Sequence, residues 1–110
     1  MTRKNKQGNS LSVRIQRSRR QKQSSPNDLP IKYAGRPTVY GNRYRVGAHH
    51  GGRVLDAVSA IELYRTDFYN DPELMERARR ELSDKNLSCW CRLDAPCHVE
   101  VLLEFLAANR

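Results

Sequence analysis

The stretch Leu87–His98 most constrains how this chain can fold, because an apolar segment there leads directly into a helical pattern. It contains all three cysteines and the only tryptophan of the sequence. If its first half is a strand, the side chains alternate, so Cys89 and Cys91 share one face and Trp90 lies on the other. Pro96 suits the first turn of a helix, and apolar residues then recur at helical spacing to near the C-terminus. The stretch therefore predicts a strand, a short loop and a closing helix.

Three interpretations of this cysteine-rich stretch remain open. Cys89, Cys91, Cys97 and His98 have the ligand types of a Cys3His zinc site, although their spacing is unusual for one. Alternatively, Cys97 is a catalytic thiolate in the first turn of the closing helix, with His98 or a more distant histidine as its base. In the third interpretation, Cys89 and Cys91 are small apolar residues of a buried strand, and His98 only lines the start of the helix.

The rest of the chain adds two strand patterns and two helix patterns. Residues alternate between apolar and polar in Leu11–Gln16, and a second short strand is expected at Leu29–Ala34. Helical periodicity runs over residues 54–69, and Asp71–Pro72–Glu73 has the cap, proline and acid that begin a helix. His49–Gly52, between the strands and the helices, is expected to be a flexible hinge.

The predicted order of elements is two strands, a loop, two helices, a strand and a helix. This order favours a small single-domain α/β protein whose parallel or mixed sheet is flanked by helices, and it excludes a helical bundle. We expect residues 1–10 to be a disordered basic tail and residues 11–110 to form the single α/β domain.

The composition indicates the cellular compartment of the protein. No apolar run is long enough for a transmembrane helix, so no membrane partner is expected, and no apolar segment follows the basic N-terminus as in a secretory signal. Three cysteines, an odd number, without such a signal indicate a reducing compartment. We therefore expect a cytoplasmic protein, in a bacterium or a phage-infected host.

Charge is concentrated at the N-terminus. Residues 1–22 contain eight of the 20 lysines and arginines and none of the 12 acids, so the other twelve basic residues balance the acids and this segment supplies the net charge of +8. Such an arm binds polyanions through counterion release, which makes nucleic acid or a nucleotide the expected partner. A merely solubilising tail is the alternative, because no base-reading motif accompanies the charge.

Several polar residues are candidates for contacting a ligand. Arg36 stands between a glycine and a proline, so its guanidinium is held by a stiff turn and suits a phosphate or carboxylate. Asn42 and Arg43 follow in the next turn, and Arg14 and Arg17 lie on or beside the first strand. Asn42 and Arg36 have ordinary alternatives, as a turn residue and as the partner of an acid on a neighbouring helix. The side chains of Arg14 and Arg17 could point to either face of the strand.

Four sequence blocks resemble a known family. They are Gly35–Arg36–Pro37, Gly41–Asn42, Cys89–Trp90–Cys91 and Pro96–Cys97–His98. In this order they are similar to the short bacterial and phage proteins called domain of unknown function forty-three twenty-six, over roughly residues 11–108. The family usually shows Trp-Gly-Asn-Pro-Phe where this chain has Tyr40–Tyr44. The resemblance implies an α/β domain in a bacterial or viral cytoplasm, and it implies no known activity.

The sequence therefore supports two hypotheses about function. In the first, the domain binds a phosphate-bearing ligand, a nucleotide or nucleic acid, with Cys97 and His98 facing the bound group; whether it catalyses a reaction stays open. In the second, the chain is a non-enzymatic adaptor that docks on nucleic acid or a host protein through its basic arm. The cysteines would then be core residues or a zinc staple.

Overall fold

The strand that carries the cysteines is the centre of the fold. The computed structural model describes residues 12–18 and 25–109, so the basic tail predicted for residues 1–10 lies outside the described residues. Strand β5 (Asn86–Cys89) pairs in parallel with β1 (Arg14–Gln16) on one side and β2 (Ile31–Tyr33) on the other. All residues of β5 are buried, as expected for the middle strand of a parallel sheet. The predicted α/β class is confirmed.

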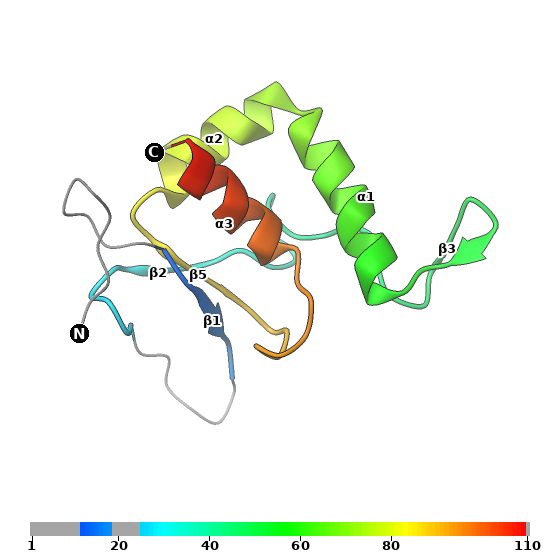
Figure 1. Ribbon diagram of the computed structural model, residues 1–110, viewed down its shortest axis with the longest axis horizontal. Helices are drawn as coiled ribbons and strands as arrows, with labels where there is room; N and C mark the ends of the chain where they lie inside the picture. Colours follow the sequence, from blue (N-terminus) through cyan, green and yellow to red (C-terminus); the bar gives the residue numbers. More distant parts are fainter. Residues whose placement is uncertain (1–11, 19–24, 110) are drawn as a thin grey trace.

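Three helices complete the domain. Helices α1 (Ala57–Tyr69) and α2 (Pro72–Leu82) lead into β5, and α3 (Val99–Ala108) follows it. Figure 1 shows the three helices grouped together, with the hairpin of β3 (His49–His50) and β4 (Arg53–Val54) extending beyond the start of α1. None of the helices in the described part of the chain is long and apolar enough to cross a membrane.

The core forms between β5 and the helices because side chains of a strand alternate. Leu87 and Cys89 pack in one hydrophobic cluster with residues from each helix: Tyr64, Phe68, Ala78, Leu82, Leu102 and Phe105. Asn86 and Ser88 alternate with them and therefore face the other side of the sheet. The buried amide of Asn86 bonds with the side chain of Asn27 and accepts from the backbone of Val13. This polar contact fixes the segments that lead into β1 and β2.

Helix starts follow the predicted chemistry. The side chain of Asp71 accepts a hydrogen bond from the Leu74 backbone, and Pro72 stands at the first helical position of α2. Asp56 caps α1 in the same manner through Ser59. The predicted start of the second helix is therefore confirmed, whereas α1 begins three residues later than the helical pattern over residues 54–69, because Val54 lies in β4.

Three local expectations were wrong. The closing helix begins at Val99, so Cys97 and His98 precede it and do not lie in its first turn. Strand β5 ends at Cys89, which places Cys91 in the loop that follows. His49–Gly52 is not a hinge but part of the β3–β4 hairpin, because two glycines with φ of 59° and 79° form the tight turn that a hairpin favours.

Candidate functional site

A pocket of about 290 Å³ lies where the parallel strands end. Tyr33 is the last residue of β2 and Cys89 the last of β5, so both strands deliver their carboxyl ends to this edge. Open α/β sheets bind ligands outside the carboxyl ends of their strands. We call this cavity the edge pocket; it is lined by Tyr33, Gly35, Arg36, Asn42, Arg45, Cys89, Trp90, Cys91 and His98.

The three cysteines converge at this edge. The sulfur atoms of Cys89, Cys91 and Cys97, the cysteine triad, lie within 4.8 Å of one another, and the Cys89 and Cys97 sulfurs are 3.2 Å apart. Cys89 and Cys97 are buried, Cys91 is half-buried, and all three are free thiols. Thiolates at this separation are ligands for a soft or borderline metal ion, so the triad could hold one.

Electrostatics distinguish the two buried thiols. The Cys97 thiol donates a hydrogen bond to the Cys89 sulfur, and this bond lowers the pKa of Cys89 and raises the pKa of Cys97. Cys89 lines the edge pocket, whereas Cys97 is not among its lining residues. Of these two buried cysteines, therefore, Cys89 is the one that lines the pocket, and not Cys97, which the sequence suggested as a nucleophile.

His98 is held in one tautomer by the segment after β2. Its Nε2 lies 2.8 Å from the Ala34 carbonyl oxygen, and since a carbonyl only accepts, Nε2 carries the proton. The unprotonated Nδ1 then faces the Cys97 sulfur at 3.7 Å. Burial lowers the pKa of His98, and the positive charges of Arg36 and Arg14 lower it further. His98 is therefore a neutral imidazole with one lone pair directed at the triad.

Two arginines, Arg36 and Arg45, line the edge pocket. Among the described residues, neither Arg36 nor Arg45 lies within ion-pair distance of a carboxylate. The backbone at Arg36 is fixed, because its carbonyl accepts the Tyr33 hydroxyl at 2.6 Å and because Gly41 packs against it. A Cβ at Gly41 would lie 2.8 Å from the Cα of Arg36. Arg36 thus offers a free guanidinium on a rigid backbone.

Other arginines predicted to contact a ligand are occupied. Arg14 is 7% exposed and bonds to Glu100 at 2.8 Å and to the carbonyls of Ala95 and Arg92. Arg43 is exposed and bonds to Asp67 at 3.0 Å, outside the edge pocket. Both side chains therefore have structural partners in this fold.

Asn42 and Arg17 lie at or beside the pocket. Asn42 lines it, but the side chain also braces the loop by donating to the Ala60 carbonyl and accepting from the Tyr44 backbone. The guanidinium of Arg17 lies over the rings of Tyr33 and Trp90, at 4.9 and 5.4 Å from their centroids. Arg17 therefore contacts both aromatic residues that line the pocket.

Sequence reasoning missed Arg45, Tyr33 and Trp90 as pocket residues. Tyr33 could have been found, because it ends a predicted strand and the carboxyl ends of parallel strands meet. No sequence signal separates Arg45 from Arg43, which precedes it by two residues; the difference arises because Asp67 of α1 lies within reach of Arg43 alone.

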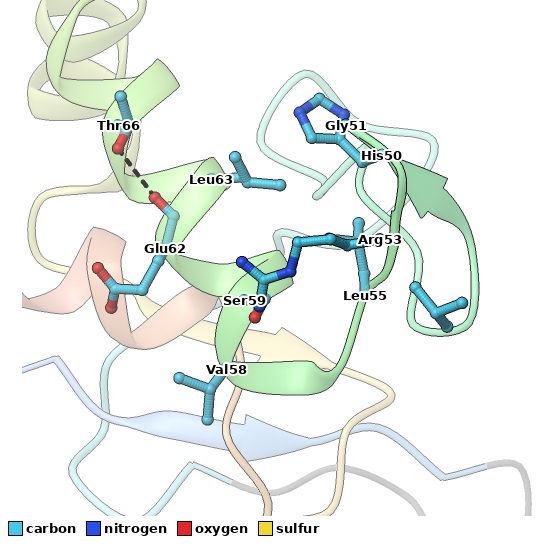
Figure 2. Close-up of a pocket in the computed structure, with 10 residues that line it drawn as sticks. His50, Gly51, Arg53, Leu55, Val58, Ser59, Glu62, Leu63 and Thr66 are labelled. Carbon is cyan, nitrogen blue, oxygen red and sulfur yellow. Dashed lines mark hydrogen bonds between the residues drawn. The ribbon is translucent and has the colours of Figure 1, made fainter.

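A second pocket, of about 430 Å³, lies between the β3–β4 hairpin and α1. Figure 2 shows His50 and Arg53 on the hairpin side and Val58, Ser59 and Leu63 on the helix side. None of the cysteines or predicted ligand-binding residues lines it. The edge pocket is therefore the better candidate for a functional site.

Comparison with known proteins identifies a family. A family model described as Domain of unknown function (DUF4326) matches residues 2–108. No curated protein and no solved structure matches the chain. Because the family model covers nearly the whole sequence, the chain belongs to the family described as Domain of unknown function (DUF4326).

Proposed function

We propose that this chain binds a small phosphate-bearing ligand, a nucleotide, in the edge pocket. The observation that carries the proposal is the pair Arg36 and Arg45, which line one cavity and have no carboxylate partner among the described residues. A guanidinium presents a rigid fork of donors that matches a phosphate, and its charge strengthens each hydrogen bond. Two such groups at one cavity are suited to an anion with several oxygens.

The aromatic wall favours a nucleotide over a bare phosphate. Trp90 is 48% exposed and lines the edge pocket together with Tyr33. A base has a flat face that stacks on an aromatic ring, at roughly 1–3 kcal/mol per base. The cavity volume, about 290 Å³, is at the lower end of ligand pockets, so a mononucleotide fits the proposal better than a dinucleotide.

Zinc is the ion that we propose for the cysteine triad, at the same edge. Thiolate sulfur is its commonest ligand in structural sites, and the thiol-rich set disfavours hard ions such as magnesium or calcium. Free thiols and a zinc site both suit a reducing compartment, which supports the expected cytoplasmic location.

Fluorescence of Trp90, the single tryptophan, provides a direct binding assay. We expect nucleoside monophosphates to change its emission on titration, and the matching nucleosides, which lack the phosphate, to bind at least tenfold more weakly. Arg36→Ala and Arg45→Ala should each weaken nucleotide binding roughly tenfold or more, as the loss of a charge-assisted hydrogen bond predicts. Arg43→Ala is the matched control, because it removes the same charge from an arginine already bonded to Asp67.

Two results would overturn the proposal. One is an equal loss of affinity in the Arg43 control, which would indicate a general charge effect. The other is the absence of binding by any of the four ribonucleoside monophosphates at millimolar concentration, under conditions where the wild-type chain is folded.

A further inference from the structure

We infer that the cysteine triad is a three-thiolate zinc site whose fourth coordination position opens into the edge pocket. In the free protein this position takes a water molecule. The inference rests on the proposed function in one respect only: when a nucleotide is bound, an oxygen of its phosphate takes the position. This is coordination alone, and no covalent bond is formed or broken.

The separation of the sulfur atoms is close to what zinc requires. Zinc–sulfur bonds of about 2.3 Å in a tetrahedron place the sulfurs roughly 3.8 Å apart. The Cys89 and Cys97 sulfurs are 3.2 Å apart, and every pair in the triad is within 4.8 Å. Shifts of roughly an ångström or less, which side-chain rotation can supply, bring all three to bonding distance of one ion.

The protein does not supply a fourth ligand to the triad at this distance. No further histidine, cysteine, aspartate or glutamate of residues 12–18 and 25–109 joins the three sulfurs within 4.8 Å. The remaining segments, residues 1–11, 19–24 and 110, contain none of these residue types. His98 directs Nδ1 at the Cys97 sulfur from 3.7 Å, but neither of its ring nitrogens lies within 4.8 Å of all three sulfurs.

The open position faces the edge pocket because of where each sulfur lies. Cys89 and Cys91 line the pocket and Cys97 does not, although Cys89 and Cys97 are equally buried, at 1% exposed. Three thiolates and Zn²⁺ carry a net charge of −1. Arg36 and Arg45, which have no carboxylate partner in the described part of the chain, lie on the pocket wall and offset that charge. An anionic oxygen can therefore approach the ion from the pocket that Arg36 and Arg45 line.

Cobalt(II) is the probe for this geometry, since it replaces zinc and reports its ligands by visible absorption. We expect the full chain to bind one equivalent of Co²⁺, with thiolate-to-cobalt charge transfer in the near ultraviolet and d–d bands of a four-coordinate ion. Adding inorganic phosphate, or separately adenosine monophosphate, should shift the d–d bands. Cys91→Ser, at the half-buried position least needed for the core, should reduce the charge-transfer intensity by about a third and weaken Co²⁺ binding; far-ultraviolet circular dichroism confirms that it is folded.

A double variant distinguishes an effect on metal binding from an effect on phosphate binding. Arg36→Ala with Arg45→Ala should keep the cobalt spectrum of the wild type but require roughly tenfold or more phosphate for the same band shift. Binding of less than about 0.1 equivalent of Co²⁺ and Zn²⁺ would overturn the metal site, while Trp90 fluorescence still decides nucleotide binding on its own.

Two further outcomes would overturn the open position. One is a cobalt spectrum that phosphate and the nucleotide leave unchanged although the fluorescence titration shows the nucleotide bound. The other is a His98→Gln variant that loses Co²⁺ affinity and a nitrogen-to-cobalt contribution, which would show a closed site with His98 as the fourth ligand.

Discussion

Arg14 connects the first strand to the loop that carries the cysteines, and replacing it tests how this loop is held. Its guanidinium bonds to the carbonyls of Ala95 and Arg92 and to the carboxylate of Glu100 at the start of α3. Arg14→Met keeps most of the side-chain volume and removes these bonds. We expect the variant to fold and to be less stable.

The expected loss can be worked from the contacts. Hydrogen bonds to a charged group contribute about 1.5–3 kcal/mol each, but part of this is recovered when water reaches the freed carbonyls. Glu100 is 53% exposed, so the ion pair itself adds no more than about 1 kcal/mol. The free energy of unfolding should therefore fall by about 2–4 kcal/mol. With a urea dependence of about 2 kcal/mol per molar, the middle of the usual range, the unfolding midpoint should fall by roughly 1–2 M.

Urea denaturation of three proteins checks this reasoning. Glu100→Gln is the matched control, because it removes the exposed partner and leaves both carbonyl contacts of Arg14 in place; it should cost less than about 1 kcal/mol. An Arg14→Met variant within about 0.5 kcal/mol of wild type would refute the reasoning. So would a Glu100→Gln variant that loses as much stability as Arg14→Met.

Three further predictions concern other parts of the molecule. The Tyr40 hydroxyl donates a hydrogen bond to the Glu81 carboxylate at 2.6 Å, and this bond lowers the pKa of Glu81. The stability that the bond contributes is therefore present above the usual glutamate pKa and is lost as the pH falls through the lowered pKa of Glu81. The difference in unfolding free energy between wild type and Tyr40→Phe, measured from pH 7 to pH 3, should accordingly shrink toward the acid end; a constant difference would contradict this. Gly41→Ala places a Cβ against the backbone of Arg36, so it should cost about 1–3 kcal/mol by urea denaturation and weaken nucleotide binding, and unchanged values of both would contradict the packing argument. If the basic arm binds nucleic acid, as its charge predicts, replacing Arg3, Lys4 and Lys6 with glutamine should make the salt dependence of single-stranded DNA binding less steep, and an unchanged slope would contradict that role of the arm. These replacements are a better test than deletion of residues 1–22, which also removes β1.

The sequence predicted the central connection of the fold correctly. Leu87 and Cys89 are apolar and lie between turn signals, and the helical pattern begins within a few residues, which left a buried strand followed by a helix as the simplest structure. The helix start at Asp71 was predicted as well, because capping depends on residues adjacent in the chain, whereas the first helix was predicted from residue 54 although its cap is Asp56. Such local rules need no knowledge of tertiary contacts.

The boundaries of the site depend on contacts between residues that are far apart in the sequence. Pro96 suggested an earlier helix start, but the segment up to His98 stays outside α3 while His98 bonds to Ala34, 64 positions away. Arg14 was a candidate for contacting a ligand, whereas the fold buries it against a loop about 80 positions later, where it bonds to Ala95, 81 positions away. Spacing alone also could not show that Cys91, beyond the end of the strand, still brings its sulfur next to Cys97.

A crystal structure of the chain grown with a nucleoside monophosphate tests the central claim most directly. The account predicts the phosphate in the edge pocket, with oxygens at about 2.7–3.2 Å from the guanidinium nitrogens of Arg36 and Arg45, and the base against Trp90. A nucleotide bound instead between the β3–β4 hairpin and α1, with both arginines left without contact to it, would contradict the account.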